Sequence, residues 1–112
     1  MANLNYAGET WKVTGALTDA DGVPLLFSDL VIMEVELIDS RSVTKTYTKA
    51  SGAIVQGSTT TSYAIEIPAA DSILFNPGAL KIKTKIEFPS ADFTGNAIDI
   101  ICETLLTISE CQ

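Results

Sequence analysis

The sequence contains no histidine and only two cysteines among its 112 residues. Without histidine, neither a Ser-His-Asp triad nor a histidine-ligated metal site can form, and the side chain that ordinarily titrates near neutral pH is missing. No serine lies in a Gly-x-Ser-x-Gly elbow, and no phosphate-binding glycine loop is present. We therefore predict that the protein is not an enzyme and that it binds no cofactor and no metal.

Basic residues are also scarce, since 7 lysines and arginines stand against 14 acids and give a net charge of −7. Nucleic-acid binding depends on neutralising phosphates, so this charge argues against a nucleic-acid partner. Residues 1–6 lack the basic start and apolar run of a secretory signal, and no window approaches the roughly 18 apolar residues that span a bilayer. We predict no signal peptide, no transmembrane segment and no membrane partner.

The two cysteines, Cys102 and Cys111, lie nine residues apart. If Cys102 belongs to a strand and Cys111 to the tail after it, one extended segment cannot bring their sulfur atoms within bonding distance. We predict a buried thiol at Cys102 and a loose one at Cys111, as in a protein kept in a reducing cytoplasm.

The abundant residues are β-branched: 13 threonines, 12 isoleucines and 6 valines. Such side chains favour strands, and apolar and polar residues alternate with period two along most of the chain. The predicted strands cover residues 9–18, 31–38, 42–49, 53–56, 60–67, 80–88 and 97–109, and residues 69–75 hold at most one helical turn. The last strand is expected to place on its core side Ile98, Ile100, Cys102, Leu106 and Ile108.

Two groups of acidic residues resemble a calcium site and a catalytic acid–base pair, but each lacks residues or geometry that such a site needs. Residues 19–22, Asp-Ala-Asp-Gly, begin like a calcium loop, but Val23 and Leu30 stand where that loop needs oxygen ligands, so a turn is favoured. Glu34 and Glu36 lie about 7 Å apart on one face of a strand. They do not converge from different environments as an acid–base pair does, so a solvated face is favoured.

Seven to eight short strands in about a hundred residues are typical of an immunoglobulin-like antiparallel β-sandwich. The length suits a single all-β domain spanning residues 1–112. A small barrel is the alternative fold.

The basic residues gather in two segments, whereas the first forty residues hold seven acids and one lysine. The ordinary explanation is that lysines protect sheet edges from aggregation. The alternative is a two-signed surface through which one copy docks on another. The candidate interface residues are Arg41, Lys45, Lys49, Lys81, Lys83 and Lys85.

The order of these pieces is similar to a known family. Residues 8–37, GETWKVTGALTDADGVPLLFSDLVIMEVEL, resemble the start of the immunoglobulin-like N-terminal domain of phage baseplate upper proteins. Residues 50–88, ASGAIVQGSTTTSYAIEIPAADSILFNPGALKIKTKIEF, are similar to that family's later half, in which a strand ends in a small helical turn and a Pro-Gly opens the next strand.

The resemblance implies a structural adaptor of a phage or prophage tail or baseplate, without an active site. Its partners would be copies of itself, in a homo-oligomer, or other tail proteins, and its location the host cytoplasm during assembly and then the virion. The alternative is a cell-surface or carbohydrate-binding β-sandwich, for which we expect an exposed aromatic platform and either a Cys102–Cys111 disulfide or an intermolecular one.

Overall fold

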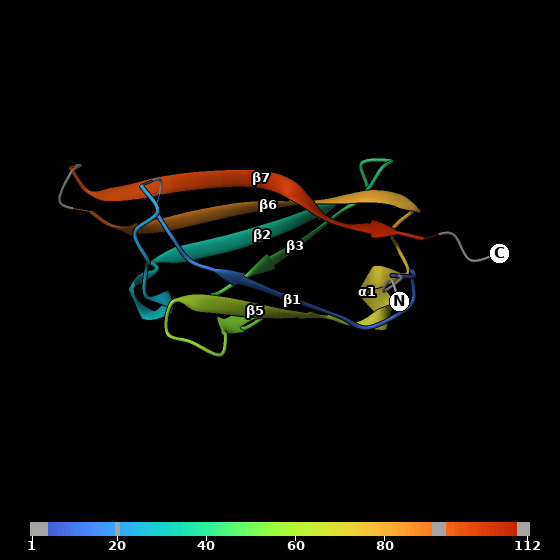
Figure 1. Cartoon of the computed structure of the whole chain (residues 1–112), viewed down its shortest axis with the longest axis horizontal. Coiled ribbons are helices and arrows are strands. Elements are labelled where there is room, and N and C mark those ends of the chain that lie inside the picture. Colours follow the sequence, from blue (N-terminus) through green and yellow to red (C-terminus); the bar gives the residue numbers. More distant parts are fainter. Residues whose placement is uncertain (1–4, 20, 91–93, 110–112) are drawn as a thin grey trace.

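The computed structural model describes residues 5–19, 21–90 and 94–109. Seven strands in these residues form two antiparallel sheets that pack face to face in a body of 52 × 28 × 27 Å (Figure 1). The strands are β1 (Trp11–Ala16), β2 (Ile32–Ile38), β3 (Thr44–Thr48), β4 (Ile54–Gln56), β5 (Ser62–Ile67), β6 (Gly78–Pro89) and β7 (Asn96–Ile108). A 3-10 turn, η1 (Phe27–Asp29), and one helical turn, α1 (Ala69–Ser72), join them.

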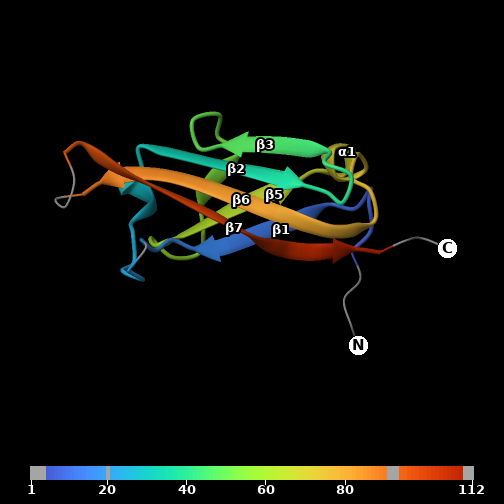
Figure 2. The same cartoon turned by 90° about the horizontal axis from the view of Figure 1, so that it is seen from above.

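The two sheets have the strand orders β1-β5-β4 and β3-β2-β6-β7. These are the orders B-E-D and C′-C-F-G of an immunoglobulin sandwich, in which the pairs β1–β5 and β2–β6 join distant parts of the chain. Figure 2 shows the strands of the two layers crossing at a small angle. The predicted immunoglobulin-like antiparallel sandwich with at most one short helical turn is confirmed, and the barrel alternative is wrong because the strands of the described residues form two separate sheets.

The core lies between the sheets, where the predicted alternation places apolar side chains. On β6, for example, Leu80, Ile82 and Ile86 are almost completely buried, and Lys81 and Lys83 between them are exposed. Phe88 at the end of β6 is also buried, and the buried hydrophobic residues from the other strands and loops are Trp11, Val13, Leu17, Leu30, Met33, Val35, Leu37, Tyr47, Ile54, Tyr63, Ala64, Ile65, Ile67, Phe75, Ala97 and Ile108. Their burial removes apolar surface from water and is the main force that holds the layers together.

The predicted turn after Asp19 is present in the described residues, where the N–H of Gly22 donates to the carbonyl of Asp19 over 3.0 Å. The Oδ1 atom of Asp19 accepts hydrogen bonds from the backbone N–H groups of Asp21 and Val23, each over 2.9 Å. Gly22 adopts φ +81°, a conformation that side-chain-bearing residues rarely accept. The aspartate oxygen is therefore used to stabilise the turn.

Two buried polar side chains tie loops together at one end of the sandwich. The Ser72 hydroxyl accepts a hydrogen bond from the N–H of Gly8 over 3.0 Å and donates one to the carbonyl of Glu9. The Asp39 carboxylate accepts four, from the backbone N–H groups of Arg41, Val43 and Asn76 and from the Asn76 side-chain amide. Burial raises the pKa of Asp39, but these hydrogen bonds outweigh it and hold the pKa below its usual value.

Strand β7 differs from the prediction because its alternation reverses at a bulge. Lys81 of β6 pairs with Thr104, and its preceding neighbour Leu80 pairs with Leu106. Leu105 therefore has no partner on β6 and is an extra residue on β7. Beyond the bulge Leu106 and Ile108 face the core, as expected. Before it, the predicted core residues face outward instead; these are Ile98, Ile100 and Cys102.

Candidate protein-interaction surface

The outer face of the four-stranded sheet carries three of the predicted interface residues in one row along β6. Lys81, Lys83 and Lys85 share this face because alternate residues of a strand point the same way. The pairing of β2 with β6 places Glu34 directly opposite Lys85, and Glu36 directly opposite Lys83. Acids and bases that are separated along the sequence are therefore interleaved on this face.

A shallow groove of about 270 Å³ runs over these charges. Its lining residues are Glu34, Glu36, Thr46, Lys83, Lys85 and Ile100. Cross-strand neighbours of opposite charge attract each other and weaken the field that either would present alone. This groove therefore offers a partner a nearly neutral polar floor rather than a pole of one sign.

The remaining basic residues lie elsewhere. Arg41 is exposed in the turn between β2 and β3, and its backbone N–H is held by Asp39. Lys45 lies on the core-directed face of β3, opposite Leu37, and its side chain extends toward α1. The structure therefore brings together the three lysines of β6 and leaves the other predicted interface residues apart from them.

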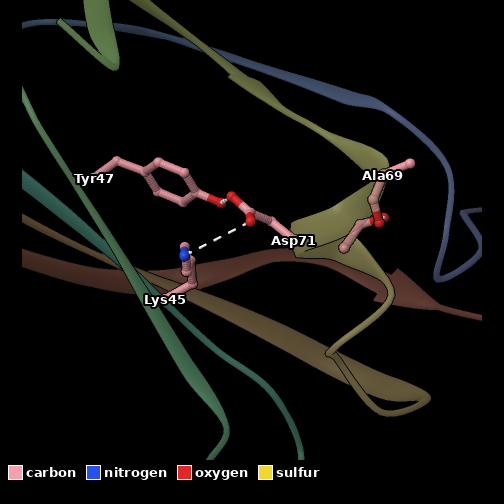
Figure 3. A network of polar contacts seen from close by, with 5 residues as sticks. Lys45, Tyr47, Ala69 and Asp71 are labelled. Carbon is pink, nitrogen blue, oxygen red and sulfur yellow. Dashed lines mark hydrogen bonds and ion pairs between the residues drawn. The ribbon is translucent and has the colours of Figure 1, made fainter.

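Lys45 belongs to a polar contact between β3 and α1 (Figure 3). Its Nζ lies 3.6 Å from Oδ1 of Asp71, while the hydroxyl of Tyr47 donates to Oδ2 of the same carboxylate over 2.9 Å. Burial, and then the bond to Asp71, raises the pKa of Tyr47 far above its usual value. This network holds the edge strand β3 against the helix.

The ammonium group of Lys49 is also bound within its own chain. Its Nζ donates hydrogen bonds to the carbonyls of Phe27 and Leu30, each over 2.8 Å, and lies 4.6 Å from the centre of the Phe27 ring. These contacts satisfy carbonyls at the end of η1 and add a cation–π attraction. The Lys49 ammonium is thus already engaged within its own chain.

Strand β7 carries three large exposed apolar side chains, more than any other strand in the described residues. Ile98, Ile100 and Ile101 expose 52%, 58% and 46% of their surface. Within the described residues β7 pairs on one side only, with β6, and forms the margin of its sheet (Figure 1). Near the end of this margin, the described residue Asn5 forms a parallel bridge with Ile108.

We call the unpaired side of β7 over residues 96–104 the β7 edge. Sequence reasoning missed it, although residues 98, 100 and 101 showed one signal: apolar residues on both faces of one strand. That pattern is typical of a strand covered on both faces, and it is equally typical of an exposed apolar edge strand that binds another protein.

The prediction of a buried thiol at Cys102 is wrong. Cys102 is exposed and unbonded, because it lies before the bulge on the outer face, directly opposite Lys83. The other predicted thiol, Cys111, lies outside the described residues.

The outer face of the three-stranded sheet holds a second, larger groove of about 860 Å³. Small side chains line much of it, among them Gly15, Ala16 and Ala64, together with the exposed Val55. Lys12 pairs in register with Glu66 at one end, so this face is also balanced in charge.

The aromatic residues do not form a binding platform in the described part of the chain. There Tyr6 and Phe27 are half-buried and the other aromatic side chains are buried; Phe93 lies outside the described residues. The same residues contain no group of three or more acids and cysteines placed to hold a metal ion. None of their helices has the length and apolar character needed to cross a bilayer.

Comparison of the chain with protein-family models, with curated proteins and with solved structures found no match.

Proposed function

We propose that this chain is a non-enzymatic structural module of a phage or prophage tail or baseplate, acting through self-association and contacts with other tail proteins. It would assemble in the host cytoplasm and remain in the virion. The resemblance of residues 8–37 and 50–88 to baseplate upper proteins supports the proposal. So does the agreement between that resemblance and the immunoglobulin-like sandwich.

The observation that carries the proposal is the distribution of apolar surface. Three isoleucines are about half exposed on a single edge strand, which pairs on one side only in the described part of the chain, whereas the described aromatic residues are buried or half-buried. Large exposed apolar side chains gathered on a strand margin are typical of surfaces that bind protein, and sugar-binding sandwiches present exposed aromatic rings. The arrangement therefore favours protein contacts over the carbohydrate-binding alternative.

Native mass spectrometry of the purified chain, alone and mixed with the proteins encoded by neighbouring genes, tests the proposal. We expect homo-oligomers, a complex with a tail protein, or both. A chain that stays monomeric at every concentration and binds none of its genomic neighbours would contradict it. Glycan-array binding without protein association would favour the alternative.

A further inference from the structure

We propose that the β7 edge is a self-association site, in which the β7 strands of two copies pair antiparallel around a two-fold axis through Ile100. This inference rests on the proposed function and names the surface that performs it. The result is one continuous sheet of eight strands, four from each copy.

The β7 edge is the longest and most apolar of the four sheet margins. The other outer strands are β1 with six residues, β3 with five and β4 with three. On β3 the exposed positions are threonines, and none of its residues is a large apolar side chain exposed to solvent. The β7 edge instead combines unpaired backbone groups with exposed Ile98, Ile100 and Ile101. A strand added at this edge would form hydrogen bonds with the backbone groups and cover the isoleucine side chains.

The length of regular strand fixes the centre of the pairing. Strand β7 begins at Asn96, and the bulge after Thr104 interrupts its regular geometry. The nine residues between these limits have Ile100 as their midpoint. A two-fold axis at Ile100 pairs every one of them with a residue of the second copy, and any other centre leaves part of the regular edge unpaired.

The charges on β7 favour the same centre. Asp99 and Glu103 point to the inner side of the strand, together with Ile101. With the axis at Ile100, Asp99 faces Ile101 and Glu103 faces Ala97, so no acid opposes an acid. Axes at residues 99, 101 or 103 would place two acids directly opposite each other, which is destabilising. The two acids therefore exclude these three registers, and the length of the regular edge selects Ile100 among the others.

The outer face is complementary in the same register. Ile100 of one copy lies against Ile100 of the other, and Ile98 lies against Cys102. On each side the next strand contributes Lys85, which is itself opposite Glu34. The joined face thus has an apolar centre with balanced charges beside it.

The area covered is small, so we expect a dissociation constant of about 1–100 µM. Each copy carries a charge of −7, so added salt should strengthen the pairing by screening the repulsion. Docking between oppositely charged poles, the arrangement suggested by the sequence, would instead weaken with salt.

Sedimentation equilibrium of the full chain up to about 200 µM tests the proposal. We compare wild type with Ile100→Lys and Ile98→Lys, which place a charge on the β7 edge, and with Val55→Lys, which places one at an exposed apolar position on the other sheet. The edge variants should weaken dimerisation at least tenfold (about 1.4 kcal/mol per factor of ten), while Val55→Lys should dimerise like wild type.

Three results would overturn this inference: a monomeric wild type, edge variants that dimerise like wild type, or a Val55→Lys variant that loses dimerisation equally. If the edge variants dimerise like wild type, the copies associate through another surface, and the proposed function still stands. A monomeric wild type that still binds a tail protein would overturn the β7 pairing alone.

Discussion

Tyr47 of β3 donates its phenolic hydrogen to the Asp71 carboxylate of α1 over 2.9 Å. The two residues are 24 positions apart in the chain, and their contact joins the edge of the four-stranded sheet to the helix that follows β5 of the other sheet (Figure 3). A hydrogen bond to a carboxylate is stronger than one between neutral groups, so the contact stabilises the packing of the two layers.

Replacing Tyr47 with phenylalanine removes this bond and keeps the ring in the core. We expect Tyr47→Phe to lower the free energy of unfolding by about 1–2 kcal/mol at pH 7. Urea titration followed by the fluorescence of Trp11, which is buried, measures the loss. Equal unfolding midpoints for the two proteins would show that the bond does not contribute.

The same residue makes stability depend on alkaline pH. Burial and the Asp71 bond raise the pKa of Tyr47, so the folded protein keeps a proton that the unfolded chain releases near pH 10. Wild type should therefore lose stability as pH rises above about 10. Tyr47→Phe should lose less over the same range, and parallel pH profiles would contradict this explanation.

At acid pH the stability of the fold depends on the Asp39 carboxylate. Its pKa is lowered in the fold, so its stabilisation is present above the pKa of the unfolded chain and is lost as pH falls through the folded value. Asp39→Asn should cost about 2 kcal/mol at pH 7, because an amide offers one acceptor where the carboxylate offers two. The difference in unfolding free energy between Asp39→Asn and wild type should become smaller below about pH 3. Asp21→Asn, at an exposed position, serves as the control and should match wild type in thermal melts at both pH values.

The lysines that the sequence groups together should respond differently to substitution. Lys49→Met keeps the apolar stem but loses two hydrogen bonds to carbonyls and the attraction to the Phe27 ring, so it should cost about 1–3 kcal/mol. Lys83→Met, on the exposed outer face, should change stability by less than about 0.5 kcal/mol. Comparable losses in differential scanning calorimetry would show that Lys49 is an ordinary surface lysine.

Gly15 is required by a close approach rather than by its backbone angle. A Cβ atom at this position would lie 2.6 Å from the ring of Tyr63, which is buried and cannot move aside freely. Gly15→Ala should therefore cost about 1–3 kcal/mol. Thr14→Ala, at the exposed neighbouring position, should cost far less, and similar denaturation curves for the two variants would contradict the clash.

Strands β6 and β7 show how far the sequence predicts the fold. On β6 strict alternation from Leu80 to Phe88 predicts the buried face, because a regular strand repeats every two residues. On β7 one extra residue at Leu105 reverses the faces, so the same argument places Ile98 and Cys102 on the wrong side. No residue type marks that bulge, and only the pairing with β6 reveals it.

The candidate surface was predictable only in part for a similar reason. Period two places Lys81, Lys83 and Lys85 on one face, and the structure confirms that. Which strand lies beside them depends on long-range pairing, so the neighbouring Glu34 and Glu36 could not be predicted. The partners of Lys45 and Lys49, on α1 and η1, likewise come from the packing of distant segments.

The central claim is that two copies pair through β7 around Ile100, and disulfide trapping tests it most directly. In a chain carrying Cys102→Ala and Cys111→Ala, we introduce either Ile100→Cys or Ile98→Cys and oxidise mildly. The axis brings the two copies of position 100 within disulfide reach, while it separates the two copies of position 98 by about 13 Å along the strand. We expect a covalent dimer for Ile100→Cys and a monomer for Ile98→Cys; no dimer at position 100, or equal amounts of dimer at both positions, would contradict pairing around Ile100.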